Sequence, residues 1–260
     1  MSADEMRWAI LRFSGDRIFV INIRECQMGD EFSEDDSVLA DLGKWRVQIR
    51  YDFDNLFQAP TGVAPPGEQD FRIHMDPTAK IPHRQPYRMT QSERKEFEVQ
   101  IKKLLEKGWV TNSHLRYAAP IIFVKKPDAT LQMCFDYHGL NSITAKDWYP
   151  LPYIQDLLDK LHGARVFTKL DLASGYHQVQ VDPDDCHKTA FIATDGFYEY
   201  KVIPFGLANA PAALMRMMHK ILHPHHWNSI VYLDDNLIFS KMLAEHKTHV
   251  EGVLQALRNA

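Results

Sequence analysis

The feature that most constrains the fold is a pair of adjacent aspartates between two apolar runs near the C-terminus. Residues 230–233 and 237–239 are apolar, and Asp234, Asp235 and Asn236 separate them. Adjacent residues of a regular strand point to opposite faces, so the two carboxylates can act together only where the chain turns. The pattern predicts a β-hairpin with these three polar residues in its turn. Asp-Asp-Asn is also common turn chemistry, so a purely structural role stays open.

A third aspartate, Asp171, lies near the end of another predicted strand, residues 166–172. Strand alternation places Asp171 on the less apolar face of that strand, together with Phe167 and Lys169. If the strand lies beside the hairpin, two or three carboxylates converge and repel one another unless a cation neutralises them. Oxygen ligands favour Mg²⁺ or Mn²⁺. Two such ions about 3.5 to 4 Å apart would stabilise both the attacking and the leaving oxygen of a phosphoryl transfer.

Other helix and strand signals alternate along the rest of the chain. A helix is predicted from Thr90, which forms a capping box with Glu93, to Gly108, with Phe97, Ile101, Leu104 and Leu105 as its buried stripe. Two hairpins are predicted, with strands at 120–126 and 131–137 and at 189–193 and 198–203. Further helices are expected over 152–163, from 209 to about 222, and around 250–257. The hairpins favour an α+β fold with a largely antiparallel sheet.

The first sixty residues carry weaker signals. A strand is expected near residues 17–23, followed by an acidic run over 29–36. Six prolines between residues 60 and 86 disfavour helix there, so the ordered domain is predicted to begin in that stretch. Residues 1–65 are interpreted as an N-terminal linker or the remnant of an upstream region.

Composition limits the class of protein. With 260 residues, 45% of them apolar and 25% charged, the chain is typical of a globular protein. Three scattered cysteines, Cys26, Cys134 and Cys186, are too few for a disulfide framework and suggest a reducing, intracellular setting. We expect neither a signal peptide nor a membrane anchor, because no apolar stretch approaches 18 residues.

Charge is unevenly distributed along the chain. The net charge is -4, yet residues 72–126 carry 12 Lys and Arg against 5 Asp and Glu. This basic stretch suits phosphate contacts, although a solvated helix face would have a similar composition. His219, His223, His225 and His226 suggest a zinc site as an alternative, but Pro224 and the lack of nearby cysteines favour an exposed loop.

Four segments together carry a family resemblance. Residues 170–178 are LDLASGYHQ, 188–191 are KTAF, 204–211 are PFGLANAP, and 232–235 are YLDD. In this order and at these separations they resemble the motifs of the reverse transcriptase of gypsy-type LTR retrotransposons, over about residues 71–257. The resemblance implies a right-hand polymerase with fingers and palm subdomains, the palm being an antiparallel sheet backed by helices.

The resemblance also assigns ranges. Fingers would comprise residues 66–145 and 178–207, and palm residues 146–177 and 208–260. No thumb, connection or RNase H region is expected within the chain. We therefore expect a fragment of a retrotransposon polyprotein, or the product of a partly decayed element.

The resemblance implies roles for individual residues. Asp171 and Asp234 would hold two Mg²⁺ ions, or Mn²⁺ in their place, with the Leu172 carbonyl as a further ligand and Asp235 in a less direct supporting role. Tyr176 would crowd the sugar 2′ carbon and reject ribonucleotides, which is sterically sensible. Contacts with the incoming nucleotide would also come from Lys126, Gln132, Phe205 and Gly206. Without the motifs, Tyr176 could equally be a core aromatic residue, Lys126 a solvated lysine, and Phe205 and Gly206 an ordinary strand end and turn.

Several positions depart from the family pattern. Gln132 replaces an arginine that contacts the triphosphate, which would cost on the order of 1 to 2 kcal/mol and slow synthesis roughly tenfold. Pro127 and Ala129 replace a lysine and a glycine, and Ala129 would be strained if that turn needs positive φ. His138 replaces a common arginine, and Asn236 an apolar residue.

The sequence therefore predicts an RNA-directed DNA polymerase, with a catalytically impaired nucleic-acid-binding remnant as the alternative. Expected partners are an RNA or DNA template–primer duplex and deoxynucleoside triphosphates, without a membrane; self-association or polyprotein partners are further expectations. We expect an intracellular location, in cytoplasmic particles, with the nucleus as a second site.

Overall fold

The computed structural model describes residues 19–22, 36–64, 67, 70–80, 84–114, 118–126, 129–150, 152–193 and 195–260. The chain divides into two compact units. Unit 1 comprises Met1–Ala59, Pro150–Ala173 and Met215–Ala260, and unit 2 comprises Pro60–Tyr149 and Ser174–Leu214. The fingers and palm ranges given above stay predictions.

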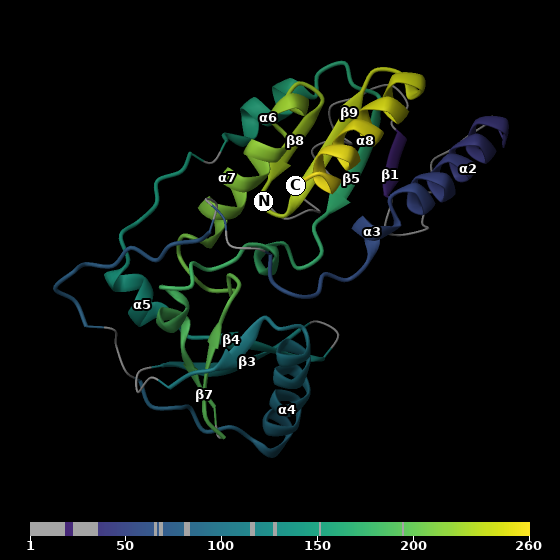
Figure 1. Ribbon diagram of the computed structural model, residues 1–260. Coiled ribbons are helices and arrows are strands. Elements are labelled where there is room, and N and C mark those ends of the chain that lie inside the picture. Colours follow the sequence, from purple (N-terminus) through teal and green to yellow (C-terminus); the bar gives the residue numbers. More distant parts are fainter. Residues whose placement is uncertain are drawn as a thin grey trace. The chain divides into compact units, whose positions relative to one another are not determined.

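Unit 1 is built on a four-stranded sheet in the order β1-β5-β9-β8 (Figure 1). Strand β1 pairs in parallel with β5, whereas β5–β9 and β9–β8 are antiparallel. The strands are β1 (Phe19–Asn22), β5 (Val166–Asp171), β8 (Ser229–Tyr232) and β9 (Asp235–Ser240). Its helices include α6 (Ile154–Lys160), α8 (Leu243–Arg258) and part of α7 (Ala210–Ile221), because the boundary between the units falls within α7. This arrangement confirms the predicted α+β class and the largely antiparallel sheet.

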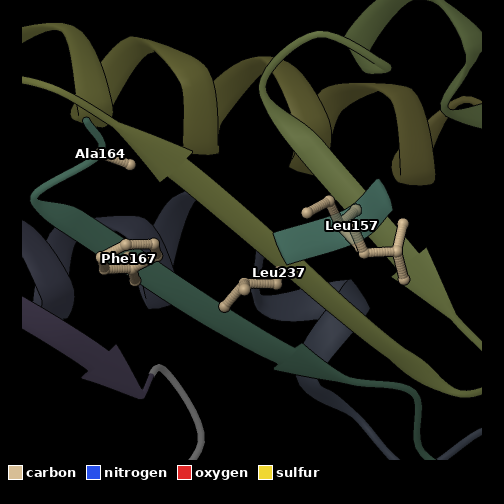
Figure 2. Packing of buried hydrophobic residues seen from close by; sticks show 5 residues of the cluster. Leu157, Ala164, Phe167 and Leu237 are labelled. Carbon is tan, nitrogen blue, oxygen red and sulfur yellow. The ribbon is translucent and has the colours of Figure 1, made fainter. Parts of the chain in front are cut away.

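The two faces of the unit 1 sheet bury different side chains. On one face, Thr168 of β5 contacts His246 of α8, with 2.8 Å between Oγ1 and Nε2. The other face carries a buried apolar cluster, shown in Figure 2, that includes Phe167 of β5, Leu237 of β9 and Leu157 of α6. Because side chains alternate along a strand, Lys169 and Asp171 continue the face of Phe167. Asp171 is thus on the face opposite α8, together with Phe167 and Lys169 as the alternation predicted, but this face also carries the buried apolar cluster.

Helices occupy part of the region that was interpreted as a linker. Helices α2 (Asp36–Asp52) and α3 (Asp54–Phe57) belong to unit 1, and several contacts join this region to α8. The Lys247 ammonium lies 2.5 Å from the Asp41 carboxylate, and the Arg258 guanidinium lies 4.5 Å from the centre of the Phe53 ring. The described part of the N-terminal region is therefore packed structure, and its strand β1 lies within the predicted 17–23 segment.

Unit 2 contains a five-stranded sheet in the order β2-β7-β6-β3-β4. Only β3 and β6 among these neighbours pair in parallel. The strands are β2 (Val110–Asn112), β3 (Ala119–Lys125), β4 (Leu131–Phe135), β6 (Phe191–Ile192) and β7 (Phe197–Tyr200), and the helices are α4 (Gln91–Glu106) and α5 (His138–Ile143).

Helix α4 begins as predicted. Thr90 and Glu93 form the capping box, with the Glu93 amide donating to Thr90 Oγ1 and the Thr90 amide donating to the Glu93 carboxylate. Phe97 and Ile101 are buried, but Leu105 is 40% exposed, so its assignment to the buried stripe was wrong. Among the described helices of both units, none is long and apolar enough to cross a bilayer.

Candidate active site

The aspartate hairpin forms, but its turn differs from the predicted one. Tyr232 pairs with Asp235, so the loop consists of Leu233 and Asp234. Asp235 and Asn236 lie in β9, which corrects the expectation that all three polar residues form the turn. Leu233 has φ 56°, a conformation that costs a residue with a side chain on the order of 1 to 2 kcal/mol. Its amide donates to the Met215 sulfur at 3.0 Å, which helps to hold this turn.

Main-chain pairing brings the three aspartates to one end of the unit 1 sheet. Asp171 of β5 is directly opposite Asp235 of β9. The Leu172 amide donates to the Asp234 carbonyl at 3.0 Å, so the pairing continues into the turn. Cα atoms of opposed residues in antiparallel strands are about 4.5 to 5.5 Å apart and their side chains share a face. Asp171 and Asp235 therefore project from the same side of the sheet, next to the Asp234 turn.

A lysine supplies positive charge at this end of the sheet. Lys169 lies two residues before Asp171 on the same face, and its ammonium is 3.0 Å from the Asp235 carboxylate. The two side chains are 31% and 20% exposed, which limits solvent screening of the pair. Lys169 thus offsets part of the repulsion between the opposed carboxylates.

The donor atoms suit a hard divalent cation. Asp171, Asp234 and Asp235 offer carboxylate oxygens, and Leu172 offers a main-chain carbonyl, which are the ligand types that Mg²⁺ prefers. In the described parts of the chain, no three His, Cys, Asp or Glu side chains are gathered closely enough to form a complete metal-binding group. The aspartates are therefore brought together by the backbone, with their carboxylates not converged on one point.

All four histidines that were suggested as a zinc site are among the described residues. No metal-binding group is found there, so they do not form such a site. His223 and His226 have ring centres 5.6 Å apart, and His226 Nδ1 lies 2.8 Å from the His223 carbonyl oxygen. His225 instead packs close to Gly252 of α8. This geometry is that of a 3₁₀ turn closing onto a helix.

Lys126 and Gln132 lie on the β3–β4 hairpin of unit 2. Val124 pairs with Gln132, and the Lys126 amide donates to the Thr130 carbonyl at 2.8 Å just beyond the last strand pair. Alternation places Val124, Lys126 and Gln132 on one face, and Lys126 and Val124 are exposed. Ala129 has φ 65°, so the turn does require a positive φ at this position. This conformation is costly for alanine, which has a Cβ, whereas glycine adopts it freely. Pro127 lies outside the described residues.

Tyr176 and Phe205 contact each other within unit 2. Their ring centres are 5.3 Å apart with the planes at 67°, an edge-to-face pair. Tyr176 lies in the 3₁₀ turn η1 (Gly175–Gln178), which follows Ser174 at φ 53°. Phe205 is 43% exposed, so one side of the pair is open to solvent.

Gly206 occupies a position that a side chain would strain. Its φ is 99°, and a Cβ there would lie 3.3 Å from the Phe135 carbonyl oxygen. Asn141 of α5 holds this segment, donating to the Gly206 carbonyl at 2.8 Å and accepting from the Ala208 amide at 2.9 Å. Asn141 was not predicted from the sequence, because its partners lie 65 and 67 positions away and no local signal marks such a pairing.

A family model described as Reverse transcriptase (RNA-dependent DNA polymerase) matches residues 124–260. The chain belongs to the reverse transcriptase family. The matched range contains every residue assigned above to the aspartate cluster and to nucleotide contact. This agrees with the retrotransposon reverse transcriptase that the sequence motifs predicted.

Curated relatives of this reverse transcriptase chain are transposon polyproteins. It is 41% identical over 180 residues to the Retrovirus-related Pol polyprotein from transposon 297 of Drosophila melanogaster, covering 67% of this chain and 17% of that protein. It is 43% identical over 162 residues to the Transposon Tf2-3 polyprotein of Schizosaccharomyces pombe, covering 62% of this chain and 12% of that protein. The chain thus spans less than a fifth of the length of these relatives.

Solved structures share its fold. A foamy viral protease-reverse transcriptase in complex with an RNA/DNA hybrid aligns with TM-score 0.71 at 22% identity, covering 84% of this chain and 30% of that chain. The native prototype foamy virus protease-reverse transcriptase aligns with TM-score 0.69 at 23% identity, covering 85% of this chain and 30% of that one. These alignments support the reverse-transcriptase architecture.

Proposed function

We propose that the chain is the polymerase portion of a retrotransposon polyprotein and extends a DNA primer on an RNA or DNA template. The observation that carries this proposal is the strand register that sets Asp171 opposite Asp235 and links Leu172 to Asp234. The chain belongs to the reverse transcriptase family, and it has oxygen donors at one end of a sheet. Oxygen donors of this kind can hold the metal ions that nucleotidyl transfer uses, which supports the proposal.

In the proposed reaction the primer 3′-hydroxyl attacks the α-phosphorus of a deoxynucleoside triphosphate. The hydroxyl loses its proton to solvent as the new P–O bond forms, the bond from the α-phosphorus to the bridging oxygen breaks, and pyrophosphate leaves. Asp171 and Asp234, with the Leu172 carbonyl, would hold two Mg²⁺ or Mn²⁺ ions, whose charge stabilises the attacking and leaving oxygens. Asp235, paired with Lys169, would act less directly.

Unit 2 would supply the contacts with the nucleotide. Lys126 and Gln132 lie on the same face of one hairpin. Both side chains could therefore contact the same triphosphate. Tyr176 would exclude a ribose 2′-hydroxyl, and Phe205 and Gly206 would line the site of the new base pair. The foamy viral relative binds an RNA/DNA hybrid, which supports a template–primer duplex as the partner.

Primer extension on an RNA template tests the proposal. With Mg²⁺ present, the native chain should incorporate deoxynucleotides, and Asp234→Asn should reduce incorporation by about a thousandfold or more. Asp159→Asn is the matched control, because Asp159 is an exposed aspartate of α6 in the same unit. Equal incorporation by the native chain and Asp234→Asn would refute the assignment.

A second candidate, a nucleic-acid binder without catalysis, is favoured by two observations. Lys169 already pairs with Asp235, and Gln132 is neutral where the family pattern has an arginine. The basic stretch 72–126 would then bind the duplex through phosphates, so affinity should fall steeply as salt rises. Salt-dependent duplex binding with no extension supports this candidate, and absence of binding at low salt eliminates it.

For location, we propose an intracellular protein in cytoplasmic particles with access to the nucleus, as the template and the product of a retrotransposon require. Immunofluorescence of the intact polyprotein tests this; secretion of the protein would contradict it.

A further inference from the structure

A column of rings in unit 2 leads from a buried tryptophan to Tyr176. Trp109 and His177 stack in parallel, with ring centres 4.6 Å apart and planes at 11°. His177 meets Phe205 edge to face at 5.3 Å and 85°, and Phe205 meets Tyr176 at 5.3 Å. Each ring thus contacts the next, and His177 connects the buried end of the column to the exposed end.

The buried end of this column is firmly anchored. Trp109 is 3% exposed, and its Nε1 donates to the Gly62 carbonyl at 2.9 Å. The Lys107 ammonium lies 4.1 Å from the centre of the Trp109 ring, within cation–π distance. Tyr200, itself 2% exposed, lies with its ring centre 6.1 Å from that of His177. His177 therefore rests on rings that cannot easily move.

We propose that His177 is a positioning residue that fixes Phe205 and Tyr176 for selection of deoxyribonucleotides over ribonucleotides. This inference rests on the proposed role of Tyr176 in excluding the 2′-hydroxyl. Steric exclusion needs a ring that cannot retreat, because a shift of about 1 Å can greatly change what a site admits. Phe205, being 43% exposed, depends on the ring behind it for its position.

His177 acts here through its ring faces and edge. Its Nδ1 is buried and has no hydrogen-bond partner, so no directional polar contact at that atom fixes the side chain. A phenyl ring is flat, of similar breadth, and keeps the stacked and edge-to-face contacts. Phenylalanine should therefore replace histidine in this role, whereas a polar side chain of similar length without a ring should not.

Nucleotide selectivity tests the inference. The ratio of kcat/KM for a deoxynucleotide to that for the matching ribonucleotide should fall about tenfold or more in His177→Ala and His177→Gln and stay near native in His177→Phe. His162→Ala, at an exposed histidine of unit 1, should leave the ratio unchanged. The inference would be overturned if His177→Ala kept the native selectivity, or if His177→Phe lost as much selectivity as His177→Ala.

A spectroscopic measurement separates failure of this inference from failure of the proposed function. In protein labelled with 3-fluorotyrosine, the ¹⁹F resonance of Tyr176 is assigned by its loss in Tyr176→Phe. That resonance should move in His177→Ala and in Trp109→Ala and return towards its native position in His177→Phe. A native chain that accepts ribonucleotides equally would refute the role of Tyr176. An unmoved resonance in His177→Ala would refute the role of His177 alone.

Discussion

The aspartates of unit 1 and the residues of unit 2 proposed to contact the nucleotide are held by different kinds of interaction. Strand register sets Asp171 opposite Asp235, and a main-chain hydrogen bond ties Leu172 to Asp234. Phe205 and Gly206, in contrast, depend on ring packing and on the Asn141 amide. Substituting one neighbouring side chain can leave the main-chain register of the strands intact. The same kind of substitution at a supporting ring or amide removes the contact that holds its partner. Selectivity should therefore be easier to disturb than the placement of the aspartates.

The two units also bury histidines differently. In unit 1, His246 is fully buried, and its two ring nitrogens each lie 2.8 Å from a hydroxyl oxygen, on Thr168 and Ser240. In unit 2, His177 is held by stacking and its Nδ1 has no partner. Burial lowers the pKa of each to about 4, with further lowering from His249 for His246 and from Lys107 for His177. Both rings are therefore neutral at pH 7.

The largest expected effect on stability comes from acid. A histidine with pKa 6.5 when unfolded and about 4 when folded binds more protons in the unfolded state between those values. The free energy of unfolding should therefore fall as the pH drops from 6.5 to 4, by about 3 kcal/mol for His246 alone. Above pH 7 the contribution of His246 should not change with pH. Urea denaturation at a series of pH values measures this.

Two variants assign the acid sensitivity to the units. In His246→Gln and in His177→Phe, the chain should take up one proton fewer on unfolding between pH 4 and 6.5. The free energy of unfolding should therefore depend less steeply on pH in each variant. An unchanged slope in His246→Gln would show that His246 is not the titrating group in unit 1.

Two buried asparagines give the next contrast. Asn236 of unit 1 is 1% exposed and neither amide atom has a hydrogen-bond partner. Asn209 of unit 2 donates to the Ala145 carbonyl and accepts from the Asp147 amide. Asn236→Leu should raise the free energy of unfolding by about 2 kcal/mol and Asn209→Leu should lower it by a similar amount. Chemical denaturation measures both, and destabilisation by Asn236→Leu would mean that its amide is satisfied.

A pair of glycines sharpens the comparison within unit 2. Gly206→Ala should lower the free energy of unfolding by about 1.5 kcal/mol, since its φ is 99° and the new Cβ would lie 3.3 Å from the Phe135 carbonyl oxygen. Gly196→Ala is the control, because a Cβ there meets no atom within 4 Å and its φ is not positive. Thermal unfolding compares the two, and equal midpoints would contradict the strain at Gly206.

The smallest expected effect is at the exposed hairpin. Gln132→Arg restores the charge of the family pattern and should lower the KM for deoxynucleotides about tenfold, equivalent to about 1.4 kcal/mol. Gln132→Glu should raise KM, because a carboxylate repels the triphosphate. Steady-state primer extension measures both, and equal KM values for the arginine and glutamate variants would remove Gln132 from the nucleotide site.

Local sequence signals predicted the elements on which these contrasts rest. The capping box of Thr90, the β3–β4 hairpin and the strand carrying Asp171 were all identified from short-range patterns. The turn at Leu233 was misplaced because turn propensity favours polar residues, whereas sheet register put an apolar residue at positive φ. Tertiary pairing outweighed local preference there.

Longer-range features could not be predicted. Helix α2 has no clear apolar stripe and is joined to α8 by contacts such as that between Asp41 and Lys247, which lie 206 positions apart. Asn141, and the ring column through His177, likewise depend on partners that are remote in the chain. Motif resemblance located Tyr176 and Phe205, but only the three-dimensional structure shows which side chains support them.

The division of the chain has a consequence for how the protein is made. Unit 1 is assembled from three separate stretches and unit 2 from two, so neither can be excised as one continuous piece. Strand β5 emerges from the ribosome more than sixty residues before β9, its antiparallel partner. Strand β5, which carries Asp171, therefore cannot complete its antiparallel pairing until β9 has been translated.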